Sequence, residues 1–379
     1  MGKTKYKYYR LNRIDKQDCQ YNVIFGERSS GKTYAVKERI LKNYFKTGEQ
    51  GAIIRRWDDD LRGVRGAVMF DDQTDLVKKL SGGKYTGVLY QSRRWYFSKY
   101  NMDTGKTEKS EEPFCYAFGL NVMEHDKSTS YPKITTVLFD EVLTRGHYLN
   151  DEFVLFMNVI STIARLRKNI KIYMLGNTVN KYCPYFAEMG LTNAKNMKQG
   201  DLDVYTYGDS GLRVAVEYTG SNSEAKESNV LFAFDNPKLH MISHGNWEID
   251  IYPHLPIYYR PQDILFMFFV EFDGEIVQGD VIGSGFEKYG NNQKREVPTH
   301  PFIYYHGKTT EIKHPQTDYI FSTQVSNLPN WHRHILKPTD KPGERIRQLM
   351  IQEYAFYQTN EIGEIVNNYI KWSKGVMLD

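Results

Sequence analysis

The chain has few cysteines and no long apolar run. Its three cysteines, Cys19, Cys115 and Cys183, are an odd number and share no metal-ligand spacing. This pattern argues against a disulfide framework and indicates buried thiols in a reducing compartment. The longest strongly apolar run, residues 264–270, is far too short to span a bilayer, and the first residues contain no apolar segment typical of a secretion signal. We therefore expect a soluble, cytoplasmic protein without membrane contact.

Positively charged residues are in only small excess over negatively charged residues. The 50 Lys and Arg residues stand against 46 Asp and Glu residues, which gives a formal net charge of +4. This balance excludes a strongly cationic chain, so any contact with nucleic acid must come from local basic patches. The sequence contains no internal repeat and no low-complexity tract. Its 379 residues are enough for two domains, each with a core of its own.

The first part of the chain alternates predicted strands and helices. Repeated strand–helix units predict an α/β fold with a mostly parallel central sheet. In chain order, we expect a strand over residues 21–25 (YNVIF), a helix over 32–45, a strand over 51–56 (GAIIRR), a strand over 133–141, a helix over 153–166 and a strand over 170–177.

Residues 84–120 depart from the parallel pattern. The segments within this range are typical of hairpin strands, and residues 103–105 (DTG) supply a turn. We therefore expect an antiparallel insertion into the first domain, which is predicted to span residues 1–195.

A polar stretch follows the first domain. Residues 196–232 are rich in Gly, Ser, Asn and Lys, a composition that predicts a linker. Residues 233–379 then form a second domain, with a hairpin over residues 264–283 that turns at Asp273-Gly274. Two helical stretches, near residues 343–356 and 361–373, complete an α+β or α/β domain.

The octapeptide GERSSGKT matches the phosphate-binding pattern G-x-x-x-x-G-K-[ST] without a mismatch, and it lies between a predicted strand and a predicted helix. Its glycines let backbone N–H groups wrap phosphate oxygens, and the helix N-terminus adds partial positive charge. Lys32 would reach the β and γ phosphates of ATP, and the Thr33 hydroxyl would ligate Mg²⁺. The alternative is a glycine-rich turn with no ligand. The predicted nucleotide-binding residues are Gly26, Glu27, Arg28, Ser29, Ser30, Gly31, Lys32 and Thr33.

Two neighbouring carboxylates, Asp140 and Glu141, end the predicted strand over residues 133–141. A phosphate-binding loop needs an acid at the tip of a neighbouring strand to hold Mg²⁺, so we assign that role to Asp140. Glu141 would lie at the same edge of the sheet and is the candidate general base for the attacking water. Asn177 ends the next strand and is a candidate sensor of the γ-phosphate. The alternative for the acidic pair is a solvated strand end.

Two arginines near the end of the predicted helix over residues 153–166 are candidates for a role in catalysis. Phosphoryl transfer spreads negative charge over the γ oxygens, and an arginine from a neighbouring subunit often stabilises that charge. Arg165 and Arg167 are the candidates. Either could instead complement the dipole at the helix C-terminus, and the residues alone leave this choice open.

Four segments of the first 190 residues resemble the genome-packaging ATPases of small, protein-primed short-tailed phages. That family is similar to the large terminase subunits, with an ASCE ATPase domain (additional strand, conserved glutamate), a linker and a domain of RNase H-like fold. Its members form a ring, thought to be a pentamer, that moves double-stranded DNA into a prohead through the portal. The segments are NVIFGERSSGKTYAVK (22–37), DKSTSYPKITTVLFDE (126–141), ARLRKNIKIYMLGNTV (164–179) and CPYF (183–186).

The resemblance implies roles for particular residues. It places Lys32, Thr33, Asp140 and Glu141 at the nucleotide and Mg²⁺ site, and it favours Arg165 as the arginine that acts on the neighbour's nucleotide. It also implies that Arg28 belongs to the nucleotide site and that Lys127 acts across the subunit boundary. The implied partners are double-stranded DNA, further copies of the chain and the portal of a prohead, with or without a packaging RNA. The implied location is the host cytoplasm and, transiently, the portal vertex.

The second domain has no signature of a nuclease. Large terminases cut DNA with a cluster of acidic residues that binds two metal ions. The available acids, Asp250, Glu271, Asp273 and Asp280, form no recognisable metal spacing, so we expect no nuclease activity.

We interpret the chain as an ATP-driven motor subunit for packaging double-stranded DNA. The alternatives are another P-loop DNA motor, such as a helicase or partition ATPase, and a nucleotide-dependent switch. An adjacent carboxylate base favours hydrolysis over a switch. A basic aromatic stretch, residues 92–100 (SRRWYFSKY), is a candidate DNA contact, although a solvated hairpin explains it equally well.

Overall fold

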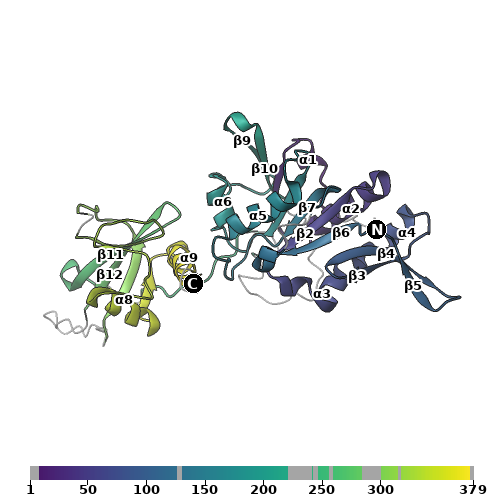
Figure 1. Cartoon of the computed structure of the whole chain (residues 1–379). Helices are drawn as coiled ribbons and strands as arrows, with labels where there is room; N and C mark the ends of the chain where they lie inside the picture. The colour runs from purple at the N-terminus through teal and green to yellow at the C-terminus, as the bar shows by residue number, and fades with distance from the viewer. Residues whose placement is uncertain are drawn as a thin grey trace, which may run out of the picture. The chain divides into compact units, whose positions relative to one another are not determined.

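The computed structural model describes residues 8–125, 130–220, 241, 246–255, 259–283, 300–314 and 317–375. The chain divides into two compact units, Met1–Glu248 and Ile249–Asp379, and Figure 1 shows the elements of each. In the described part of the chain, no helix is both long and apolar enough to cross a membrane. The three cysteines are buried and free, as predicted.

The first unit is built on six parallel strands. Successive strands in the sheet are joined through the hydrogen-bonded pairs β6–β2, β2–β7, β7–β8, β8–β1 and β1–β10. Because parallel strands end at the same edge of a sheet, the loops that follow β1, β7 and β8 meet there. The strands are β1 (Tyr21–Gly26), β2 (Gln50–Arg55), β6 (Cys115–Gly119), β7 (Ile134–Asp140), β8 (Lys171–Asn177) and β10 (Leu212–Tyr218).

Helices cover both faces of this sheet. The helix α2 (Lys32–Thr47) packs in one apolar core and α5 (Glu152–Ala164) packs in the other. Successive side chains of a strand point to opposite faces, so Leu138 of β7 contacts the core of α2 and Phe139 stacks on Phe156 of α5. The sheet is therefore buried on both sides, which explains why its strands are continuous apolar runs rather than alternating ones.

The predicted antiparallel insertion is confirmed at one edge of the sheet. There β4 pairs with β3, β5 and β6 in antiparallel register. The turn between β4 and β5 contains residues 103–105, and Figure 1 shows the β4–β5 ribbon extending from the edge of the unit. The strands are β3 (Gly87–Gln91), β4 (Arg94–Asn101) and β5 (Lys106–Lys109).

The predicted linker needs correction over its described part. Residues 202–207 form β9 (Leu202–Tyr207), which pairs antiparallel with β10, and β10 pairs in parallel with β1. The first unit thus extends to Glu248 rather than to residue 195. The two strands were not predicted, because the polar stretches on both sides give the whole range the composition of a loop.

The second unit has a six-stranded sheet in the order β15-β14-β11-β12-β13-β16. Strands β11, β12 and β13 form an antiparallel meander, and β14 and β15 are added in parallel beside β11. This is the strand order of an RNase H-like sheet, as predicted. The strands are β11 (Ile264–Phe272), β12 (Glu275–Ile282), β13 (Phe302–Gly307), β14 (Tyr319–Ser322), β15 (Trp331–His332) and β16 (Ala355–Tyr357).

The hairpin and the helices of the second unit follow the predictions with one difference. Asp273 and Gly274 have φ angles of 53° and 79°, the positive values that a two-residue hairpin turn requires. The helix α8 (Lys341–Ile351) ends before residue 356, because β16 follows and pairs with β13. The helix α9 (Asn360–Gly375) contacts β11, β12 and β13.

The remaining elements are short. They are α1 (Asn12–Asp15), η1 (Asp58–Leu61), α3 (Gly63–Ala67), η2 (Val68–Gln73), α4 (Thr74–Leu80), η3 (Leu120–His125), α6 (Pro184–Glu188), η4 (Gly208–Ser210) and η7 (Pro261–Asp263).

Candidate functional site

The loop between β1 and α2 has a backbone that only glycine adopts easily at its two ends. Gly26 has φ of 148° and Gly31 has φ of 90°. A Cβ atom at Gly26 would lie 2.1 Å from the Thr219 hydroxyl oxygen, so a side chain has no room there. Because α2 begins at Lys32, the N–H groups of its first turn have no acceptor within the helix and are available to anionic oxygens.

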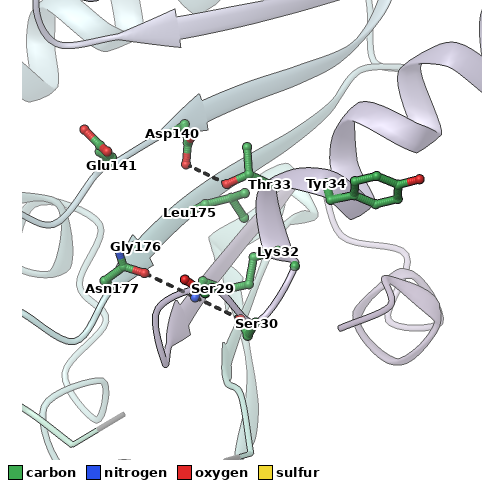
Figure 2. Close-up of a pocket in the computed structure, with 11 residues that line it drawn as sticks. Ser29, Ser30, Lys32, Thr33, Tyr34, Asp140, Glu141, Leu175, Gly176 and Asn177 are labelled. Carbon is green, nitrogen blue, oxygen red and sulfur yellow. Dashed lines mark hydrogen bonds between the residues drawn. The ribbon is translucent and has the colours of Figure 1, made fainter. Parts of the chain in front are cut away.

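A pocket of about 270 Å³ lies at the C-terminal edge of the parallel sheet. Figure 2 shows that the phosphate-binding loop, the end of β7 and the end of β8 form its wall. The parallel order of the strands brings these distant segments together. The lining residues are Ser29, Ser30, Gly31, Lys32, Thr33, Tyr34, Asp140, Glu141, Leu175, Gly176 and Asn177.

Lys32 is buried at the base of this pocket. Its ammonium group donates to the carbonyl oxygen of Glu27 at 2.7 Å and contacts the Ser30 hydroxyl at 3.3 Å. It also donates to Oδ1 of Asn177 at 3.4 Å, as Figure 2 shows. The positive charge is therefore held within the loop, and Asn177 of β8 is connected to it directly.

Thr33 and Asp140 face each other across the pocket. The Thr33 hydroxyl donates to Oδ1 of Asp140 at 3.2 Å, and Arg55 donates to Oδ2 at 2.9 Å. Burial raises the pKa of Asp140, and the guanidinium of Arg55 offsets only part of that effect. A hydroxyl and a carboxylate are the hard oxygen ligands that Mg²⁺ prefers, and proteins hold this ion through one or two such groups with phosphates and water. These two donors fit Mg²⁺.

Glu141 projects from the end of β7 into a more open position. Its side chain is 62% exposed, and its Oε2 lies 2.8 Å from NH1 of Arg55. Glu141 also has φ of 65°, a value that is strained for a residue with a side chain. Arg55 thus pairs with both carboxylates at once. Although burial alone would lower it, Asp140 and Glu141 raise the pKa of Arg55 above its ordinary value.

Arg56, which follows Arg55 in the chain, holds the backbone just after the end of β7. Its guanidinium donates to the carbonyl oxygens of Glu141 and Val142 at 3.2 Å and 3.0 Å. It also forms a buried ion pair with Glu152 of α5 at 2.7 Å. Neither Arg55 nor Arg56 was predicted as a site residue. The signal was present, because two arginines end the apolar strand GAIIRR at the edge where the phosphate-binding loop lies.

Arg165 lies immediately after α5 and does not line the pocket of its own chain. Its backbone has φ of 50° and ψ of −122°, outside the regions that residues with side chains favour. The next residue, Leu166, is 98% exposed. The structure therefore displays this turn on the surface of the first unit.

Arg167, the alternative to Arg165, has a different environment. Its guanidinium donates to the carbonyl oxygens of Tyr131, Pro132, Ile134 and Ile163 at distances between 2.7 Å and 3.0 Å. A group with this many acceptors in its own chain has a structural explanation.

Three residues of the predicted nucleotide site, Gly26, Glu27 and Arg28, do not line the pocket. The side chain of Arg28 forms an ion pair with Glu248 and does not line the pocket. Glu27 is buried and contributes its carbonyl oxygen to Lys32. Lys127 lies outside the described residues, so its predicted role stays a prediction.

Two of the four acids of the second unit, Asp280 and Glu271, have hydrogen-bond partners within that unit. Asp280 accepts hydrogen bonds from Tyr259, Gln278 and His306, and although burial alone would raise it, these bonds hold the pKa of Asp280 below its ordinary value. Glu271 accepts a hydrogen bond from Ser322. Over the residues that the structure describes, no group of three His, Cys, Asp or Glu side chains is arranged to hold a metal ion.

Comparisons with a family model and with curated proteins indicate the same family. The family model of the podovirus DNA encapsidation protein (Gp16) matches residues 3–207. The DNA packaging protein of Bacillus phage PZA is 26% identical over 270 residues, which are 70% of this chain and 73% of that protein.

Two solved structures are similar over both units. The Phi-29 viral genome packaging motor assembly has a TM-score of 0.52 at 19% identity, covering 95% of this chain and 98% of the other. The Phi-28 gp11 DNA packaging motor has a TM-score of 0.51 at 18% identity, covering 98% of each chain. At these identities the likeness shows a shared fold.

Proposed function

Because the chain belongs to the podovirus DNA encapsidation protein (Gp16) family, we propose that it is the ATP-hydrolysing motor subunit that moves double-stranded viral DNA into a preformed prohead. The observation that carries this proposal is the set of charged groups around one pocket. Lys32 supplies a positive charge, Thr33 and Asp140 supply two oxygen ligands for Mg²⁺, and Glu141 supplies a carboxylate next to them.

Each residue of the pocket has a separate role in phosphoryl transfer. Lys32 neutralises charge on the β and γ phosphates, and the loop N–H groups hold their oxygens. Thr33 and Asp140 would hold a Mg²⁺ ion, which would supply further positive charge at the phosphates. Asn177 already contacts Lys32, so it is placed to sense whether the γ-phosphate is present.

Glu141 takes the proton from the attacking water. In the described structure Arg55 pairs with Glu141 at 2.8 Å. The Glu141 side chain can turn from Arg55 toward the attacking water, because it is mostly exposed and Arg56 holds only the backbone of Glu141.

Arg165 completes the site of a neighbouring copy. Its strained turn lies outside its own pocket, which suits a residue that acts across a subunit boundary. The subunits then form a ring, which we infer to be a pentamer, and the ring docks at the portal vertex of a prohead in the host cytoplasm. DNA passes through this ring without sequence preference, so phosphate contacts rather than base contacts are expected.

The test of the proposed function is a packaging reaction. Purified chain, ATP, Mg²⁺, phage DNA and portal-bearing proheads should yield DNA protected from added DNase. DNA should also stimulate ATP hydrolysis, which a nucleotide-dependent switch does not require. Protection that is independent of ATP, or ATP hydrolysis that separates duplex strands without proheads, would contradict the proposal and favour another P-loop motor.

The action of Arg165 in trans has a specific test. Arg165→Ala and Glu141→Gln subunits should each be inactive alone, whereas a mixture should regain part of the ATPase activity. A mixed interface pairs an intact Glu141 on one chain with an intact Arg165 on its neighbour. The measurement is the steady-state ATPase rate at constant total protein. A mixture that stays inactive while both variants assemble would reject Arg165 and leave Lys127 as the next candidate.

A further inference from the structure

The antiparallel strands β3, β4 and β5, at one edge of the first sheet (Figure 1), have two faces of different character. Trp95 and Phe97 of β4 point to one face, where they are fully buried in the apolar core that contains α2. Tyr96 and Tyr100 point to the other face, because successive side chains of a strand alternate. Neither tyrosine belongs to that core or to the core that contains α5. We call this second face the tyrosine face, and its strand positions are Gly87, Leu89, Gln91, Arg94, Tyr96, Ser98, Tyr100, Thr107 and Lys109.

The tyrosine face carries positive charge without negative charge. Arg94 of β4 and Lys109 of β5 are its charged residues, and both side chains are exposed. Among the residues of β4 and β5, all of which the structure describes, the one carboxylate is Glu108. Glu108 pairs with Lys99 and therefore points to the opposite face. The charges of the ribbon are thus sorted between its two faces.

Both cations of the tyrosine face lie over aromatic rings. The guanidinium of Arg94 is 5.8 Å from the ring centroid of Tyr116 in β6, and the ammonium of Lys109 is 4.2 Å from that of Tyr96. Lys109 also donates to Oε1 of Gln91 at 2.7 Å. Ring faces attract these cations without neutralising them. An anion can therefore bind them without first displacing a carboxylate.

The donors of this face are spaced widely enough to contact separate phosphates. Lys109 pairs with Ser98, which lies four residues beyond Arg94 on β4, or about 13 Å along an extended strand. Tyr100 is 56% exposed and adds a hydroxyl further along the same strand. Arg, Lys and Tyr side chains commonly contact DNA phosphates, and such contacts carry no sequence information.

We propose that the tyrosine face is a contact surface for the phosphate backbone of double-stranded DNA, with Arg94, Tyr100 and Lys109 as the phosphate-binding residues. The proposal rests on the proposed function, because it takes duplex DNA as the polymer that the motor moves. A duplex is a regular polyanion, and it complements a face that carries cations and no carboxylate. A motor that moves any sequence needs contacts of this kind.

The structure divides the basic aromatic stretch over residues 92–100 into parts with different roles. Arg94 belongs to the tyrosine face. Arg93 instead pairs with the buried carboxylate of Asp58, and Lys99 lies on the opposite face. The choice between a DNA contact and a solvated hairpin is therefore a choice about one face of the ribbon, and it can be tested with residues of both faces.

The experiment measures the affinity of full-length variants for a labelled DNA duplex of mixed sequence at several salt concentrations. Arg94→Gln combined with Lys109→Gln should reduce the magnitude of the slope of log affinity against log salt by about 1.8, since each lost phosphate contact removes about 0.9. Lys99→Gln combined with Lys106→Gln is the matched control, because it removes two exposed cations from the opposite face of the same ribbon. The control should leave the slope unchanged. ATP hydrolysis without DNA should be the same in all chains, since none of these residues lines the nucleotide pocket.

Lysine acetylation of the wild-type chain tests the surface without a substitution, and it covers the case in which a variant does not fold. Bound duplex should protect Lys109 from acetylation more than Lys106, which lies on the same strand and points to the opposite face. Mass spectrometry of the digested chain measures the modification of both lysines.

Four results would overturn the proposal. They are an unchanged slope when Arg94 and Lys109 are replaced, an equal change in the control, equal protection of Lys109 and Lys106, and an effect of the first pair on the binding of an RNA duplex but not of DNA. The second result would indicate a general effect of charge, and the fourth would assign the face to RNA. In each case the wild type still binds DNA and the proposed function stands. A wild type that hydrolyses ATP but binds no duplex DNA would reject the proposed function and this surface with it.

Discussion

Replacing Lys32 with alanine should reduce ATP hydrolysis by about two to three orders of magnitude, the usual cost of removing one preorganised group that stabilises transition-state charge. The ammonium group is buried, and the carbonyl of Glu27 and the amide of Asn177 hold it at the base of the pocket. Its loss leaves the phosphates without their main compensating charge, so nucleotide binding should also weaken. Steady-state phosphate release and equilibrium binding of a fluorescent ATP analogue measure the two effects.

Lys42→Ala is a matched control for this variant. Lys42 lies on the same helix, α2, and makes an exposed ion pair with Glu38. Exposed pairs of this kind contribute little to stability, so the control removes the same charge without disturbing the pocket. Equal loss of activity in both variants, or hydrolysis at the wild-type rate in Lys32→Ala, would remove the basis for the nucleotide site.

Replacing Glu141 with glutamine should lower kcat by about two to four orders of magnitude while nucleotide and Mg²⁺ binding remain. Glutamine occupies the same volume but cannot accept the proton of the attacking water. The ligands Thr33 and Asp140 keep their contact, because neither depends on the Glu141 side chain. Single-turnover hydrolysis and equilibrium binding, measured on the same preparation, separate the two effects.

Glu38→Gln, at the exposed ion pair on α2, is the control for the loss of one carboxylate. The opposite pattern is informative as well. If Glu141→Gln lost Mg²⁺-dependent binding together with turnover, Glu141 would be a metal ligand and the base would have to be another group. A variant that turned over at the wild-type rate would show that neither role is needed.

Much of the pocket could be predicted from the sequence because its main parts are contiguous. Residues 26–33 carry the whole phosphate-binding loop, since the turn, the lysine and the hydroxyl must be neighbours to wrap one phosphate chain. Asp140 and Glu141 end an apolar strand, and a parallel sheet places such ends at a common edge. The structure puts residues 29–33, Asp140 and Glu141 around one pocket.

The contacts that hold the carboxylates could not be predicted in this way. Arg55 lies 85 positions from Asp140, and only the pairing of β2 with β7 brings the two together. The contact of Arg28 with Glu248 likewise depends on the course of a distant segment. The strands β9 and β10 were missed for a different reason, since polar residues on both sides gave the range the composition of a linker. A local sequence pattern reflects the secondary-structure propensity of its residues, whereas these features depend on contacts between distant segments of the chain.

Arg167 connects two distant parts of the first unit. It fastens the end of α5 to the backbone of residues 131–134, where β7 begins, and the other end of β7 carries Asp140. The strand β7 has seven residues and is about 20 Å long. Because it is hydrogen-bonded to β2 on one side and to β8 on the other, it is a stiff element. Any displacement of β7 would therefore reach the turn that carries Arg165. The strand that carries Asp140 and the turn that carries Arg165 are thus mechanically connected within one chain.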